Sequence, residues 1–287
     1  MRIKLPILIL LVIVLCGCGR REEPAEITDV KGTTEKEIFE CSFGGKPRRF
    51  SIYLPESAEG DLPLIIMLHG YASSPESFRR ETHMEEAACA RGFAVAYAGT
   101  DGFEWKGRVG TSTEDDVAWL TALARYLQKT YNCSPERTYA VGFSNGAFMT
   151  QELAVHAEDT FAAVCSVAGS MPKLTWESRN EKADVGVMII YGTGDAVVPK
   201  RSDGSAETAY DPPIEDVMDY WSGANALDRK TEEKLSERAS LTRYTAAGAS
   251  KEVCRIEIEG GQHSWPKETF CGFDPYRVIL DFFDRCK

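Results

Sequence analysis

Residues 138–147 read Thr138-Tyr-Ala-Val-Gly-Phe-Ser-Asn-Gly-Ala147. The stretch begins as a strand-like apolar run, contains the pattern G-x-S-x-G around Ser144, and leads into a helix-like segment, residues 145–157. By itself the pattern is a weak signal, because glycine and serine are common and also form ordinary turns. Between a strand and a helix it is typical of a nucleophile elbow, in which a sharp turn exposes a serine hydroxyl. We therefore predict that Ser144 is a nucleophile.

The rest of the chain alternates strand-like runs with helical periodicity from residue 49 onward. Repeated strand–helix units of this kind form a mostly parallel, doubly wound sheet with helices on both faces. Together with the elbow they predict the α/β-hydrolase fold, and the absence of an internal repeat predicts one catalytic domain, residues 37–287. The predicted strands are residues 50–54, 64–68, 93–98, 138–143, 161–168, 185–191 and 253–259, and the predicted helices are residues 76–91, 114–130, 145–157, 213–227 and 275–285.

A serine hydroxyl is a poor nucleophile until a base takes its proton, so a histidine is required. His263 follows two glycines directly after the last predicted strand, where this fold places its base. His69 is the rival, but its place at the end of an early strand suits an oxyanion loop instead. His83 and His156 fall within predicted helices and are expected to be surface or packing residues.

An acid must hold the base in the correct tautomer. Asp195 ends the run Tyr191-Gly-Thr-Gly-Asp195, which follows a predicted strand and lies between the serine and the histidine. Asp184, Asp203 and Asp211 are more simply explained as solvated turn residues. The order Ser144, Asp195, His263 is the order of the α/β-hydrolases.

The oxyanion formed by nucleophilic attack requires preorganised N–H donors. The first predicted donor is the backbone N–H of Asn145, immediately after the nucleophile. The second is the N–H of Tyr71, in the loop His69-Gly-Tyr71, because a glycine lets that loop approach closely.

The first residues have the pattern of an export signal. Residues 1–4 include the basic Arg2 and Lys4, and residues 5–15 form an apolar run too short to span a bilayer, so residues 1–17 are predicted to be a signal peptide. The sequence Leu15-Cys-Gly-Cys18 resembles a bacterial lipobox and predicts a lipidated Cys18. Residues 18–36 would then be the lipid-bearing cysteine and a flexible tether. We expect a lipoprotein at the outer membrane or cell surface; the alternative is a secreted protein with an ordinary signal peptide.

The net charge is −11, and removal of residues 1–17 would take away two basic residues and no acidic residue. This charge disfavours nucleic acid, anionic lipid and polyuronate, and favours a neutral substrate. In an oxidising compartment the remaining cysteines allow up to three disulfides, whose pairing the sequence leaves open. No Cys-x-x-Cys pair occurs among them, so we expect neither a metal site nor a cofactor. They are Cys41, Cys89, Cys133, Cys165, Cys254, Cys271 and Cys286.

Several motifs are shared with one known group. They are Leu68-His-Gly70, Ser77-Phe78, Asp115-Asp-Val117, Val141-Gly-Phe-Ser-Asn-Gly146, Tyr191-Gly-Thr-Gly-Asp195, Gly260-Gly-Gln-His-Ser-Trp-Pro266 and Phe282-Phe283. With these motifs, residues 43–285 resemble the polyhydroxybutyrate-depolymerase-like esterases. That group overlaps carbohydrate esterase family 1, with its feruloyl and acetyl-xylan esterases. The resemblance implies a serine esterase that removes feruloyl or acetyl side groups from neutral plant polysaccharide through an acyl-enzyme.

Aromatic side chains near these motifs are candidates for the substrate cleft. Trp265, two residues after the predicted base, is the first candidate, followed by Trp221, Trp105 and Phe143. Each tryptophan could equally be a core residue. The chain departs from its relatives at Trp221-Ser-Gly-Ala-Asn-Ala226, where many carry Trp-x-x-x-Asn-Gly-Cys. The family's disulfide and the shape of the cleft wall near Trp221 are therefore not carried over.

Two other readings remain open. A depolymerase or oligomer hydrolase of short-chain poly(3-hydroxyalkanoate) would use the same three residues on a different acyl group. A non-catalytic surface lipoprotein that binds glycan would have no need of Ser144, Asp195 and His263. A peptidase is disfavoured by the resemblance alone. The sequence determines neither the acyl group nor the oligomeric state.

Overall fold

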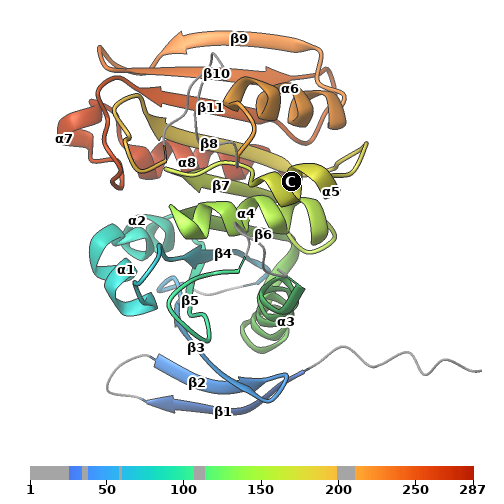
Figure 1. Ribbon diagram of the computed structural model, residues 1–287. Coiled ribbons are helices and arrows are strands. Elements are labelled where there is room, and N and C mark those ends of the chain that lie inside the picture. The colour runs from blue at the N-terminus through green and yellow to red at the C-terminus, as the bar shows by residue number, and fades with distance from the viewer. Residues whose placement is uncertain (1–25, 34–37, 58–59, 107–113, 199–210) are drawn as a thin grey trace, which may run out of the picture.

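The computed structural model describes residues 26–33, 38–57, 60–106, 114–198 and 211–287. The predicted signal peptide and Cys18 lie outside these residues. The described residues form one eleven-stranded sheet, in the order β1-β2-β3-β5-β4-β6-β7-β8-β11-β10-β9, with helices on both faces (Figure 1). The predicted α/β architecture is confirmed.

The centre of the sheet is parallel and its two edges are antiparallel. The parallel strands are β5 (Ala94–Ala98), β4 (Leu62–Leu68), β6 (Cys133–Phe143), β7 (Ala163–Val167), β8 (Gly186–Gly192) and β11 (Val253–Ile258). The antiparallel strands are β1 (Ile27–Thr33), β2 (Ile38–Phe43) and β3 (Lys46–Tyr53) at one edge, and β10 (Ala239–Thr245) and β9 (Arg229–Lys234) at the other. β4, β5, β7 and β8 are buried along almost their whole length, which is why they are mostly apolar, whereas β6 and β11 also contain charged residues.

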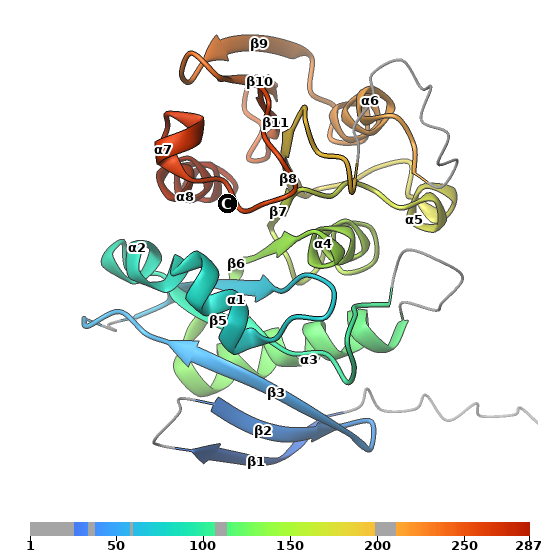
Figure 2. The same ribbon diagram turned by 60° about the vertical axis from the view of Figure 1, so that its left-hand side comes forward.

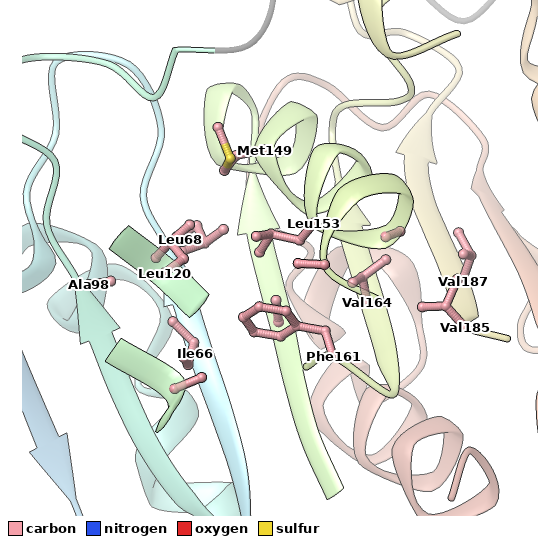
Figure 3. Close-up of a cluster of buried hydrophobic side chains, with 14 of the residues drawn as sticks. Ile66, Leu68, Ala98, Leu120, Met149, Leu153, Phe161, Val164, Val185 and Val187 are labelled. Atoms are coloured by element: carbon pink, nitrogen blue, oxygen red, sulfur yellow. The ribbon is translucent and has the colours of Figure 1, made fainter. Parts of the chain in front are cut away.

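The helices divide between the two faces of the sheet (Figure 2). One face carries α3 (Glu114–Tyr131), α4 (Asn145–His156), α5 (Lys173–Ser178) and α6 (Ile214–Ala224), and the other carries α1 (Pro75–Thr82), α2 (Met84–Ala90), α7 (Glu268–Cys271) and α8 (Pro275–Arg285). On the first face Leu120 of α3 and Leu153 of α4 pack with Ile66 and Leu68 of β4 (Figure 3). No helix in the described ranges combines the length and apolar character needed to cross a bilayer.

Two segments in the N-terminal half of the chain differ from the predicted secondary structure. Residues 27–33, predicted as part of a flexible tether, form strand β1, which pairs antiparallel with β2. The single helix predicted over residues 76–91 is two helices separated by His83. His83 has a left-handed backbone with φ 47°, and the next residue donates its N–H to the Tyr97 hydroxyl.

The seven cysteines from Cys41 onward are all free thiols, so the predicted disulfides are absent from the structure. Six of them are buried and Cys89 is partly buried. Burial raises the pKa of the Cys41, Cys89 and Cys133 thiols to about 11, so these three remain protonated at neutral pH.

Candidate active site

Ser144 lies on a strained turn between β6 and α4. Its backbone has φ 53° and ψ −112°, a conformation that costs a non-glycine residue about 1–3 kcal/mol. The flanking glycines make the turn possible. A Cβ on Gly142 would lie 2.1 Å from the Gly146 carbonyl oxygen, and a Cβ on Gly146 would lie 2.2 Å from the Leu68 carbonyl oxygen. The two glycines of the motif are therefore required because backbone passes where their side chains would be.

The structure brings the three predicted side chains into one hydrogen-bonded chain. His263 Nε2 lies 2.9 Å from Ser144 Oγ, and His263 Nδ1 lies 2.8 Å from Asp195 Oδ2. Because a carboxylate accepts, Nδ1 carries a proton and Nε2 is free to accept the serine proton. This is the geometry of a nucleophile, a base and an orienting acid.

Asp195 is buried, and all its polar contacts favour its ionised form. Oδ1 accepts the N–H groups of Val197 and Val198, at 2.9 and 2.8 Å, while Oδ2 accepts from His263. Burial raises the pKa of this carboxyl group, but the hydrogen bonds and the charge of His263 outweigh burial, and the pKa is held below its ordinary value. Asp195 is thus a carboxylate at neutral pH.

The loop that carries His263 packs closely against the loop that carries Asp195. A Cβ on Gly192 would lie 2.1 Å from the Gly261 carbonyl oxygen, and Gly194 donates its N–H to the same oxygen at 2.9 Å. The ring of Phe143 lies 5.2 Å from the His263 ring, centroid to centroid, and supports it from the side of the elbow. Backbone contacts and one ring therefore fix the position of the base.

The two predicted oxyanion donors come from the start of α4 and from the loop after β4. Asn145 is the first residue of α4, so its N–H has no acceptor within the helix. The loop with Tyr71 follows β4, and Gly146 allows this loop to touch the first turn of α4. His69, the rival base, is buried, and its Nδ1 faces the Gly70 carbonyl oxygen at 2.8 Å. Burial lowers the pKa of His69.

Three of the four predicted substrate contacts are wrong, because the tryptophans are core residues. Trp265, Trp221 and Trp105 are 2%, 0% and 1% exposed. Trp265 packs edge-on against Phe78, and Trp221 donates its indole N–H to Gln151. Only Phe143 is partly exposed beside the base.

Two aromatic side chains in the loops after β4 and β5 are exposed: Tyr71, 66% exposed, and Phe103, 75% exposed. Their loops are joined, since Ala72 donates its N–H to the Phe103 carbonyl oxygen at 2.7 Å. Phe103 was not among the predicted substrate contacts. The sequence signal that could have identified Phe103 is its place directly after β5. β5 lies next to β4, and the oxyanion loop follows β4.

One group of metal-ligand side chains occurs among the described residues: His83, Glu85 and Glu86, at the junction of α1 and α2. It shares no residue with the Ser144–His263–Asp195 chain. The predicted hydrolytic reaction does not use these three residues.

A serine on a strained strand–helix turn, bonded to a histidine and an aspartate from later strand ends of a parallel sheet, defines an α/β-hydrolase. Solved structures agree on the fold. The acetyl xylan esterase from Aspergillus awamori has a TM-score of 0.64 with 12% identity, covering 90% of this chain and 99% of its own. Residues 48–197 match the esterase PHB depolymerase family, and the chain belongs to this family. It is an esterase.

Several relatives have been named for their activities. NocK of Nocardia uniformis subsp. tsuyamanensis, named as an esterase, is 30% identical over 88% of this chain and 79% of its own. The bifunctional acetylxylan esterase/xylanase XynS20E of Neocallimastix patriciarum is 26% identical over 77% of this chain and 31% of its own. Feruloyl esterase B of Thermothelomyces thermophilus is 27% identical over 44% of this chain and 46% of its own. The alignments thus span less than half the length of the last two relatives.

Proposed function

We propose that this esterase removes feruloyl or acetyl side groups from a neutral plant polysaccharide through an acyl-enzyme on Ser144. The hydrogen-bonded chain from Ser144 through His263 to Asp195 is the observation that carries the hydrolytic part of the proposal. The names of the relatives support the acyl groups and the polysaccharide.

The geometry suits a two-step reaction. Ser144 Oγ attacks the ester carbonyl carbon while His263 Nε2 takes the hydroxyl proton, and the carbonyl oxygen becomes an oxyanion facing the N–H groups of Tyr71 and Asn145. The intermediate collapses, and the leaving sugar oxygen takes the proton from His263. Water then attacks the acyl-serine with His263 again as the base, which releases the acid and restores Ser144.

The surface beside the nucleophile supports a polysaccharide substrate. The exposed rings of Tyr71 and Phe103 can stack on a sugar or on an aromatic acyl group. Phe103 also borders an open groove of about 830 Å³ along β1–β3, whose mixed polar and apolar lining includes the charged side chains of Lys31, Glu40 and Asp101 but no residue of the Ser144–His263–Asp195 chain. The charged side chains of this groove can form hydrogen bonds with sugar hydroxyl groups.

A panel of three substrates tests the proposal: methyl ferulate, acetylated xylan, and a 3-hydroxybutyrate oligomer. We expect kcat/KM on one of the first two to exceed that on the oligomer by at least about tenfold, a difference of about 1.4 kcal/mol in transition-state stabilisation. Activity confined to the oligomer would favour the second candidate, a short-chain poly(3-hydroxyalkanoate) hydrolase, which the family name supports.

Phe103 provides a sharper test of the aromatic surface. Aromatic stacking contributes about 0.5–1.5 kcal/mol, so Phe103→Ala should lower kcat/KM on methyl ferulate by about three- to tenfold more than on methyl acetate. The matched control is Phe270→Ala, which removes another exposed ring, one that packs against Arg238, and should leave the ratio unchanged. An equal loss on both esters in Phe103→Ala would contradict the proposed stacking.

We further propose that the enzyme is exported and held at a membrane by a lipid on Cys18. The support comes from the sequence of residues 1–18 alone.

A further inference from the structure

Residues 99–106, which follow β5, are bound to the nucleophile elbow through the side chain of Asn145. Asn145 Oδ1 accepts the backbone N–H of Trp105 at 2.6 Å, and Asn145 Nδ2 donates to the Trp105 carbonyl oxygen at 3.0 Å. Both ends of the amide are therefore used on one residue, and a reversed amide would place donor against donor. This fixes the first residue of α4 relative to Trp105.

The same segment also holds the loop that carries Tyr71. Trp105 donates its indole N–H to the His69 carbonyl oxygen at 3.0 Å, and Phe103 accepts the N–H of Ala72 at 2.7 Å. These bonds lie two residues before Tyr71 and one residue after it. The Gly70–Tyr71 peptide, which presents the Tyr71 N–H, lies between these two bonds, and its own carbonyl oxygen accepts the Ser73 N–H at 3.3 Å.

The segment is itself anchored at both ends. Trp119 donates its indole N–H to the Gly99 carbonyl oxygen at 3.1 Å. The N–H of Lys106 donates to Asp116 Oδ2 at 2.9 Å, and Asp116 forms a buried ion pair with Arg48, also at 2.9 Å. A segment with both ends held can act as a rigid bridge between the two loops.

We propose that Asn145, through its side chain, and Trp105 are positioning residues that set the separation of the Tyr71 and Asn145 N–H groups in the oxyanion hole. Oxyanion donors lower the barrier only when they are already in place as charge develops. An aspartate at position 145 would place a carboxylate against the Trp105 carbonyl oxygen and beside the developing negative charge, so the neutral amide is required. The inference rests on the proposed ester hydrolysis.

Two variants test the bridge. Asn145→Ala keeps the backbone N–H but removes both bonds to Trp105, and we expect kcat on p-nitrophenyl acetate to fall by about 10- to 100-fold with KM changed by less than about threefold. Trp105→Phe keeps an aromatic side chain but removes the indole N–H that bonds to His69, and we expect kcat to fall by about three- to tenfold. Affinity for an aryl trifluoromethyl ketone, whose adduct with Ser144 carries an oxyanion, should fall in parallel with kcat/KM.

The matched control is Trp221→Phe. Trp221 is as buried as Trp105, and its indole N–H donates to Gln151 of α4 at 2.8 Å, a bond that the variant loses. Within the described residues, Trp221 makes no hydrogen bond to the oxyanion loop. We expect a comparable loss of thermal stability with kcat and ketone affinity changed by less than about twofold.

Several results would overturn the inference. If kcat/KM falls in Asn145→Ala and Trp105→Phe but the affinity for the ketone does not, the loss of activity does not arise in the oxyanion hole. A loss of activity in Trp221→Phe as large as that in Trp105→Phe would indicate general destabilisation. If Asn145→Ala does not fold, Trp105→Phe decides alone. Ser144→Ala is measured in parallel: full activity in that variant would refute ester hydrolysis by Ser144 itself, a failure distinct from that of the bridge.

Discussion

Ser144, His263 and Asp195 form one hydrogen-bonded unit, so their substitutions should not act independently. Ser144→Ala, His263→Ala and Asp195→Asn should each lower kcat on a soluble ester by about 10⁴-fold or more. The three side chains act together in one proton transfer, which fails when any of them is replaced. The double variant Ser144→Ala/His263→Ala should be hardly slower than either single variant. Steady-state rates of purified variants with native circular dichroism provide the measurement. Nearly additive losses would contradict the assignment.

Asp195 predicts a dependence of stability on pH. Its pKa is lower in the folded protein than its ordinary value, so its carboxylate stabilises the fold above that ordinary value, near 3.8. The contribution is lost as pH falls through the lower folded pKa. Melting temperatures measured from pH 7 to pH 3 should therefore fall further for the native protein than for Asp195→Asn. Parallel curves for the two proteins would contradict this linkage.

The reacting residues could be predicted from sequence because each follows a strand and is marked by glycines that a close backbone contact requires. Gly142 and Gly192 are two such positions. The aromatic residues could not be assigned in the same way. A tryptophan has an apolar body and one N–H, and it is equally suited to a cleft or to a core that offers an acceptor. For Trp105 and Trp221 the acceptors, His69 and Gln151, lie 36 and 70 residues away in sequence.

At the scale of elements, the contact between β4 and α4 depends on Gly146. A Cβ there would lie 2.2 Å from a backbone oxygen that cannot move without displacing the end of β4. We expect Gly146→Ala to lower the free energy of unfolding by about 1–3 kcal/mol and to lower kcat, because the oxyanion loop follows β4. Urea unfolding and ester hydrolysis measure the two effects.

Gly223, in α6, supplies the matched control for that substitution. A Cβ at Gly223 would meet no atom within 4 Å, so Gly223→Ala should be neutral or should stabilise the helix by up to about 1 kcal/mol. Equal effects of the two substitutions would show that the contact with β4 is not the cause.

The elements that were predicted correctly are those with a strong burial pattern. β4, β5 and β8 contain no charged residue, and α8 runs from Pro275 to Arg285, the predicted bounds. The edge strands β1, β2, β9 and β10 were missed, as were the short helices α5 and α7. β9 reads Arg-Lys-Thr-Glu-Glu-Lys and is exposed throughout, so only its pairing with β10 makes it a strand. Such pairing depends on tertiary structure and leaves no periodic signal.

For the whole molecule, the proposed lipid anchor predicts where the protein is found. Full-length protein expressed in a bacterial host should sediment with membranes, whereas Cys18→Ser should be recovered in the soluble fraction with unchanged kcat, because a diacylated cysteine is removed and the catalytic domain is untouched. Mass spectrometry of the mature N-terminus identifies the modification. Recovery of the full-length protein in the soluble fraction, cleaved at another residue, would refute the anchor.

The charged strand β9 also determines how the sheet ends. An open sheet presents a row of unpaired N–H and carbonyl groups along its last strand, and a second chain can add to that row. Here the last strand carries five charged side chains of both signs among its six residues, all exposed. Another copy of β9 could pair with it only by bringing charged side chains of like sign together or by holding a single register. The composition of β9 therefore protects a long, open sheet from growing into aggregates by edge-to-edge addition.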